Sequence, residues 1–230
     1  MKYLYFILHL FTISFPLVRS FEPRIQYAKK WKALFTGIAI SGGFFIIWDI
    51  IFTRLGVWGF NPRYLMGIYL FNLPIEEILF FITVPFASVF IYECVIYFLP
   101  RIQTSGLIKL VTGVLGFNLL IISALHFNQL YTFWNFLFAG IFLVFTAIIN
   151  PHWLGKFWTA YLIHLIPFII VNGILTGYQL DEPIVWYNNA ENLSIRIITI
   201  PIEDTMYALL LLLMNVTFYE KFKVSIKQNP

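Results

Sequence analysis

Charged side chains are scarce in this chain. Asp, Glu, Lys and Arg make up 11% of its 230 residues, whereas a soluble globular domain carries roughly 25%. Hydrophobic residues account for 60%, aromatic residues for 20%, and the mean hydropathy is +0.82. This composition excludes an ordinary soluble domain and predicts an all-α integral membrane protein.

Cysteine and nucleotide-binding motifs are also lacking. The single cysteine, Cys94, lies in an apolar run and can form neither an internal disulfide nor a metal cluster. The four histidines show no ligand spacing, and no Gly-x-Gly-x-x-Gly, Walker loop or Cys-x-x-Cys occurs. The sequence has no basic patch with interleaved aromatic residues, which argues against nucleic-acid binding. We therefore expect neither a metal nor a bound cofactor.

Seven apolar stretches are candidates for membrane-spanning helices, each of which needs ~20 residues to cross ~30 Å of hydrocarbon. They cover about 3–19, 33–52, 74–99, 107–125, 133–149, 158–177 and 200–219. The first could pass for a secretory signal peptide. However, Val18 and Arg19 stand where a cleavage site needs a small residue, so we interpret this stretch as a retained helix.

A proline followed by a pair of acids occurs twice. The tetrapeptide Pro74-Ile75-Glu76-Glu77 returns 127 residues later as Pro201-Ile202-Glu203-Asp204. The same offset relates further pairs, namely Trp31 and Trp158, Asn61 and Asn188, and Tyr92-Glu93 and Tyr219-Glu220. These matches predict an internal duplication with a three-helix repeat over 1–100, a linker helix over 101–129 and a second three-helix repeat over 130–230. Because a single linker helix stands between two three-helix repeats, both repeats have the same orientation in the membrane. The two acidic motifs then lie at the same depth.

Lysine and arginine are concentrated on one side if the stretches alternate across the membrane. That side carries Arg19, Arg24, Lys29, Lys30, Lys32, Arg101, Lys109, Lys156, Lys221, Lys223 and Lys227. The other side has only Lys2, Arg54, Arg63 and Arg196. The positive-inside rule predicts a multi-pass protein of the cell (inner) membrane, with its N-terminus outside and its C-terminus in the cytoplasm. Both acidic motifs then lie towards the outer face.

The four acids of the two motifs are the main candidates for chemistry. Carboxylates in a membrane-spanning segment are costly and need a reason. A proline at the first helical position starts a helix, and acids in the first turn are favoured by its dipole. Burial and a neighbouring carboxylate oppose ionisation. We therefore expect some of these carboxyls to stay protonated near neutral pH and to act as general acids; they are Glu76, Glu77, Glu203 and Asp204.

Aromatic residues accompany each motif. Phe80 and Tyr207 stand four residues after Glu76 and Glu203, so each ring shares a helix face with an acid. Aromatic faces attract cations and would suit chemistry that passes through a carbocation, although an aromatic helix face is also typical of plain packing.

The connections 53–73 and 178–199 are rich in Trp, Tyr, Asn and Gly. They form either an aromatic belt at the lipid headgroups or a lid over the acids. Polar residues within the apolar stretches make helix–helix hydrogen bonds or belong to the same site. The candidate substrate-binding residues are Asp49, Trp58, Phe60, Asn61, Phe80, Asn172, Thr176, Trp186, Tyr187, Asn188 and Tyr207. Glu93 and Glu220, at the far ends of the same stretches, are expected to be structural and close to Arg101 and Lys221.

These motifs resemble the heterodimer-type lycopene cyclases, in which two small polypeptides each carry a Pro-x-Glu-(Glu/Asp) motif; here the two are fused in one chain. The resemblance extends over nearly the whole sequence. In the first half it includes Trp48-Asp49, Gly56-Val57-Trp58-Gly59-Phe60-Asn61-Pro62 and Leu73 before the acidic motif. In the second half it includes Asn172-Gly173-Ile174-Leu175-Thr176 and Trp186-Tyr187-Asn188.

The resemblance implies an enzyme, an intramolecular lyase or isomerase that closes the ends of lycopene to β-rings without net redox change. γ-Carotene and then β-carotene would form, and no flavin would be needed. The substrate would be lycopene or a related linear carotenoid taken from the bilayer lipid. On this interpretation Glu76 and Glu203 are the acids, and Glu77 and Asp204 are conjugate bases or orienting partners. A homo-oligomer and contacts with other carotenoid enzymes are both compatible with the sequence.

Other readings stay open. Relatives in the same family act on C50 carotenoids, and the sequence does not determine whether one or both ends are closed. A plan of three helices, a linker helix and three more is also that of SWEET-type sugar transporters. Acids at helix starts and few polar residues argue against such a hydrophilic path. A retinal protein is disfavoured because the segment 197–219 contains no lysine.

Overall fold

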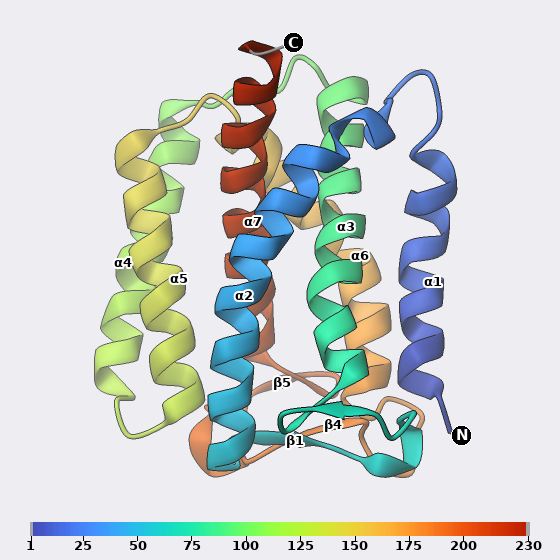
Figure 1. The fold of residues 1–230 in the computed structure, drawn as a ribbon. Coiled ribbons are helices and arrows are strands. Elements are labelled where there is room, and N and C mark those ends of the chain that lie inside the picture. The colour runs from blue at the N-terminus through green and yellow to red at the C-terminus, as the bar shows by residue number, and fades with distance from the viewer. Residues whose placement is uncertain (1, 229–230) are drawn as a thin grey trace.

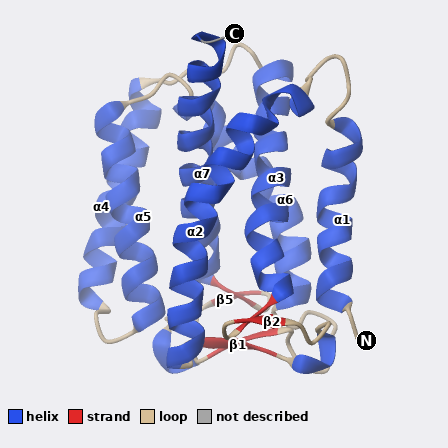
Figure 2. Cartoon of the chain, in the orientation of Figure 1, coloured by secondary structure: helices blue, strands red, loops and turns tan. Residues whose placement is uncertain are grey.

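The computed structural model describes residues 2–228, with side chains as far as residue 223. Its helices stand side by side between two ends of the molecule, and the short strands gather at one of these ends (Figures 1 and 2). The described helices are α1 (Leu4–Arg19), α2 (Trp31–Leu55), α3 (Ile75–Phe98), α4 (Gly106–Leu125), α5 (Leu130–Ile149), α6 (Leu154–Leu175) and α7 (Ile202–Gln228). The predicted all-α fold of seven helices is confirmed.

Six of these helices are long and apolar enough to cross a membrane, and the protein is a multi-pass membrane protein. The seventh, α1, has only 16 residues but runs alongside α3 and buries Tyr5 and His9. Several helices are longer than the apolar stretches from which they were predicted. The helix α6 begins at Leu154 and α7 continues to Gln228, because polar residues extend these helices beyond their apolar parts.

The strands form three antiparallel pairs in the connections that follow α2 and α6. The pairs are β1 (Trp58–Phe60) with β4 (Val185–Tyr187), β2 (Tyr69–Leu70) with β3 (Leu73–Pro74), and β5 (Arg196–Ile197) with β6 (Ile200–Pro201). The first pair joins the two connections to each other, whereas the other two are local hairpins that lead into α3 and α7.

The two repeats are related by an approximate twofold axis along the bundle. In the β1–β4 pair, Gly59 is the register partner of Trp186, which occupies the same position in the second repeat. Both α3 and α7 start at the strand end of the molecule (Figure 1). The predicted parallel arrangement is confirmed. The linker helix α4 packs closely on α5, since a Cβ atom on Gly140 would lie 2.8 Å from the carbonyl oxygen of Gly116.

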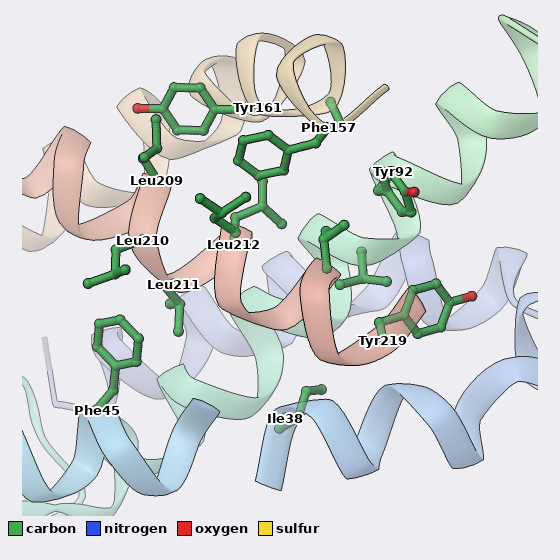
Figure 3. Close-up of a cluster of buried hydrophobic side chains, with 14 of the residues drawn as sticks. Ile38, Phe45, Tyr92, Phe157, Tyr161, Leu209, Leu210, Leu211, Leu212 and Tyr219 are labelled. Atoms are coloured by element: carbon green, nitrogen blue, oxygen red, sulfur yellow. The ribbon is translucent and has the colours of Figure 1, made fainter. Parts of the chain in front are cut away.

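The helix α7 is at the centre of the bundle. Its segment from Leu209 to Leu213 is buried on all sides, which is typical of a core helix. Figure 3 shows α7 among side chains of three other helices: Ile38 and Phe45 of α2, Tyr92 of α3, and Phe157 and Tyr161 of α6. The acids at the start of α7 are thereby fixed in position by a large apolar core.

Equivalent residues also cross between the repeats at the end of the molecule opposite the strands. Tyr92 of α3 donates a hydrogen bond to Glu220 of α7 at 3.0 Å, and Tyr219 of α7 donates one to Glu93 of α3 at 2.7 Å. Each repeat thus supplies one tyrosine and one acid. These reciprocal bonds join α3 to α7.

The basic partners of these acids differ from the expected Arg101 and Lys221. Glu93 is 1% exposed and forms ion pairs with Lys30 and Lys223. Glu220, which was expected beside Lys221, instead forms an ion pair with Lys223 at 3.3 Å, and the Lys221 side chain is exposed. The prediction of a structural role for Glu93 agrees with this buried network. Lys227, whose charge also entered the orientation argument, has a side chain outside the described part.

Replacing Glu93 by Gln would remove the charge that both lysines share. Removing one partner of a buried ion pair typically costs about 3–5 kcal/mol, and the partial exposure of the lysines favours the lower value. We expect a clearly lower unfolding temperature for detergent-solubilised Glu93→Gln. Asp181→Asn, which breaks the exposed ion pair with Arg63, should change it little. Equal unfolding temperatures for the two variants would contradict a stabilising role for the crossed contacts.

Candidate active site

A cavity of about 60 Å³ lies between the β1–β4 pair and the first turns of α3 and α7. Three carboxyl groups from both repeats line it: Asp49 of α2, Glu77 of α3 and Asp204 of α7. Their residues are at most 9% exposed. The two repeats therefore share one acidic cavity, and each acidic motif contributes its second acid to it.

The carboxyl group of Asp204 accepts three hydrogen bonds. Tyr131 of α5 donates to its Oδ1 atom at 2.5 Å, and Asn172 of α6 and Tyr187 of β4 donate to Oδ2 at 2.8 and 3.0 Å. Hydrogen bonds to an ionised acceptor are stronger than those between neutral groups. This arrangement therefore stabilises a negative charge on Asp204.

Glu77 has fewer partners, although it holds the equivalent position in the first repeat. Tyr5 of α1 donates to its Oε2 atom at 2.6 Å, and no other hydrogen bond to this carboxyl is found among the described residues. Asp49 is similar: Trp58 donates to Oδ1 at 2.5 Å, while the buried Oδ2 has no partner in the described part of the chain. The cavity thus combines one carboxyl that has three hydrogen-bond donors with two carboxyls that have one donor each.

The first acids of the motifs, Glu76 and Glu203, do not line the cavity. They accept equivalent bonds from the preceding connections, Glu76 from the backbone N–H of Met66 at 2.6 Å and Glu203 from that of Leu193 at 2.7 Å. Glu203 also accepts a bond from Thr132 of α5 at 2.7 Å. Consecutive residues of a helix point about 100° apart, so Glu77 and Asp204 face the cavity and their neighbours Glu76 and Glu203, interpreted from the sequence as the acids, point elsewhere.

The local structure of the motifs explains this orientation. Pro74 and Pro201 are the last residues of β3 and β6, and the helices begin one residue later than expected, at Ile75 and Ile202. Each proline thus stands at the junction where the chain passes from a hairpin into a helix. Both acids of each motif still lie in the first turn, as predicted.

The β1–β4 pair covers the cavity on one side. Side chains alternate between the two faces of a strand, and the inner face carries Trp58, Phe60, Val185 and Tyr187, all of which line the cavity. The outer face carries Trp186, which is 43% exposed. Of the two interpretations of these connections, the structure agrees with the lid.

Aromatic rings form much of the remaining wall. The rings of Tyr131 and Tyr187 are stacked with their centroids 5.7 Å apart, and Trp58 lies edge-on to Tyr131 at 5.1 Å. Tyr207 lies 6.4 Å from Tyr131 and 6.3 Å from Trp58. We call Trp58, Tyr131, Tyr187 and Tyr207 the aromatic box. All four rings line the cavity next to the carboxyls, and aromatic faces attract cations.

Tyr187 lies outside the membrane-spanning helices. Its burial and the nearby negative charge of Asp204 raise the pKa of its phenol group well above the usual value. The hydroxyl therefore stays protonated and keeps donating to Asp204 under all ordinary conditions.

The structure brings most of the candidate residues to this cavity. Besides the carboxyls, the lining includes the predicted residues Trp58, Phe60, Phe80, Asn172, Tyr187 and Tyr207. Four other candidates do not line it. Asn61 and Asn188 each accept a backbone hydrogen bond that caps a short 3₁₀ turn, Thr176 bonds to Thr199 and to the carbonyl oxygen of Asn172, and Trp186 faces outward.

Sequence reasoning missed the two tyrosines that donate to the second acids. Tyr5 and Tyr131 are equivalent in the structure but stand 126 residues apart in the sequence, so a comparison at the constant offset of 127 does not align them. It also missed Ser88 and His164, which line the deeper part of the cavity and contact each other at 3.0 Å. No group of three or more His, Cys, Asp or Glu side chains placed to hold a metal ion occurs in the described residues.

The fold and the cavity define a multi-pass membrane protein of two parallel repeats that jointly enclose a site of carboxyl groups and aromatic rings. Comparison with protein families gives a match to the lycopene cyclases over residues 2–95 and 128–222, one segment in each repeat. The chain belongs to the lycopene cyclase family. The unmatched residues between the two segments contain the linker helix α4. Searches of curated proteins and of solved structures found no match.

The contact between Gly59 and Trp186 offers a test of the lid. The indole ring of Trp186 occupies the space that a Cβ atom on Gly59 would need. Gly59→Ala should therefore displace one strand of the lid, lower stability by about 1–3 kcal/mol and slow turnover. Gly43→Ala in α2, where a Cβ atom meets nothing within 4 Å, is the matched control and should be neutral or stabilising. Thermal unfolding of the two variants that does not differ would contradict this role of Gly59.

Proposed function

We propose that this protein is a lycopene β-cyclase that converts the open ends of lycopene to β-rings by acid catalysis without a redox step. The observation that carries the proposal is the unequal environment of two equivalent acids. Glu77 has one hydrogen-bond donor and Asp204 has three, although both line the same cavity. A pair of carboxyls whose environments differ in this way is typical of an acid and a base that act together.

Glu77 is the proposed general acid. Its proton adds to C2 of the terminal C1=C2 double bond and leaves a tertiary cation at C1. The electrons of the C5=C6 double bond then form the C1–C6 bond and move the cation to C5. Asp204, as the carboxylate, removes the proton from C6, and the C5=C6 double bond forms again in the closed ring. One proton is gained and one is lost, so the product is an isomer of the substrate.

The walls of the cavity support this chemistry. The aromatic box surrounds the reacting end and can stabilise the cations at C1 and C5 through its π-faces. The lid formed by β1 and β4 separates this place from bulk water, which would otherwise add to a cation. Asp49, bonded to Trp58 of the lid, is a third carboxyl of the same cavity and holds this ring in place.

This assignment exchanges the roles expected from the sequence. Glu76 and Glu203 become positioning residues, because each holds a backbone N–H of the connection that covers the site. Their function is to fix the helix start and the lid relative to each other. All four acids of the motifs thus serve the site, two directly and two through the backbone.

The proposed location is the cell membrane, with the N-terminus and the acidic cavity towards the outside and the C-terminus in the cytoplasm. Eleven of the 15 lysine and arginine residues lie towards the cytoplasmic side in this orientation, which supports it. The substrate is then a linear carotenoid dissolved in the bilayer.

Pigment analysis in a lycopene-accumulating bacterial host tests the function. The wild type should convert lycopene to β-carotene through γ-carotene, whereas Glu77→Gln should lower conversion by at least ~100-fold, since proton transfer in catalysis typically contributes 10²–10⁴-fold. Asp204→Asn should be similarly slow, and its residual product should include ring isomers that have lost a proton from a position other than C6. Glu182→Gln, which changes an exposed acid near the lid, is the control.

The outcomes separate the alternatives. Unchanged lycopene, with the wild type present in the membrane, would contradict the proposed substrate and direct attention to C50 carotenoids. Normal conversion by Glu77→Gln together with loss in Glu76→Gln would restore the roles expected from the sequence. Ring isomers from Glu77→Gln rather than from Asp204→Asn would exchange the acid and the base.

A further inference from the structure

A long apolar groove continues from the acidic cavity towards the other end of the molecule. Residues of α1, α3 and α6 line it, and its volume is about 500 Å³. The cavity and the groove share six residues: Phe80, Val84, Ser88, His164, Phe168 and Asn172. The two spaces therefore adjoin each other, and a ligand in the groove would have one end next to the carboxyls.

The groove is long and straight. Its floor is a stripe of α3 that runs from Phe80 to Leu99, which corresponds to about 28 Å at the rise of an α-helix. This length is comparable to the ~30 Å thickness of the hydrocarbon core. Its walls are almost entirely apolar, so they fit an extended hydrocarbon rather than a polar solute.

Among the described residues, side chains occupy the equivalent place in the second repeat. The helices α5, α7 and α2 of the second site correspond to α1, α3 and α6 of the groove. Thr12 and Val171 line the groove, and their equivalents are Phe138 and Phe44. The rings of Phe138 and Phe44 lie in contact, with their centroids 5.4 Å apart and edge to face. Two large rings thus fill the place that two small residues leave open.

Three positions of the floor near the cavity differ in the same direction. Small residues of α3 in the groove correspond to larger ones of α7, namely Val84 to Leu211, Ala87 to Met214 and Ser88 to Asn215. In α6 the groove residue His164 corresponds to Gly37 of α2. A Cβ atom on Gly37 would already lie 3.4 Å from the backbone of α7, so α2 and α7 are in close contact, whereas His164 is large enough to separate α6 from α3.

We propose that the groove between α1, α3 and α6 binds the straight part of the carotenoid while one of its ends reacts at Glu77 and Asp204. This inference rests on the proposed function and adds the place and direction in which the substrate lies. Because a single groove leads to a single pair of carboxyls, the two ends of the substrate react in separate binding events. The half-cyclised carotenoid must leave, turn around and bind again with its open end first.

Closing the groove with the residues of the second repeat tests this proposal. The double variant Thr12→Phe/Val171→Phe introduces the two rings that close the equivalent space. We expect it to lose at least ~50-fold in cyclisation of lycopene in proteoliposomes. The control is Leu10→Phe/Ile170→Phe, which adds the same rings to lipid-facing positions that are 52% and 54% exposed. The control should stay within about twofold of the wild type.

The order of product formation provides a second measurement that needs no variant. Labelled lycopene is given to the wild-type protein, and a large excess of unlabelled lycopene follows when monocyclic product has formed. Separate binding events predict that the excess prevents the labelled monocyclic carotenoid from becoming bicyclic.

The contradicting results are distinct from those for the proposed function. Equal rates for Thr12→Phe/Val171→Phe and the control, with both cyclising, would overturn the groove and leave the function intact. Conversion of the labelled monocyclic carotenoid that is unaffected by the excess would overturn separate binding events. No cyclisation by the wild type would overturn the proposed function itself.

Discussion

A carboxyl group inside a membrane protein is tolerated only where hydrogen-bond donors compensate its loss of water, and the structure depends on this constraint. Each acidic motif receives its donors from other elements. The helices α1 and α5 supply Tyr5 and Tyr131 to the second acids, and the connections supply backbone N–H groups to the first. The duplicated helices and connections therefore serve to hold four acids at one end of the bundle.

The duplication supplied two equal sets of residues, but the site that they form is single and asymmetric. Additional donors from Asn172 and Tyr187 reach Asp204 and have no equivalents at Glu77. The groove is open in one repeat and filled by Phe44 and Phe138 in the other. A symmetric scaffold thus holds two carboxyls in different environments, as the proposed reaction with one acid and one base requires.

Much of this architecture could be predicted from the sequence. The apolar stretches are long enough to span a membrane as helices, which indicates seven helices. The constant offset of 127 residues indicates that these helices form two parallel repeats. The sequence could not determine which acid of each pair turns inward. That depends on the start of α3 and α7 one residue after each proline. Tyr5 and Tyr131 were missed because the first helices of the repeats align at a different offset.

The central claim is that Glu77 is protonated and Asp204 is ionised in the resting protein. Infrared spectroscopy of the purified protein in lipid tests it directly, since a protonated carboxyl group absorbs at a higher frequency than a carboxylate. The account predicts that the protonated-carboxyl absorption decreases in Glu77→Gln and is unchanged in Asp204→Asn. A decrease in Asp204→Asn with no change in Glu77→Gln would contradict it.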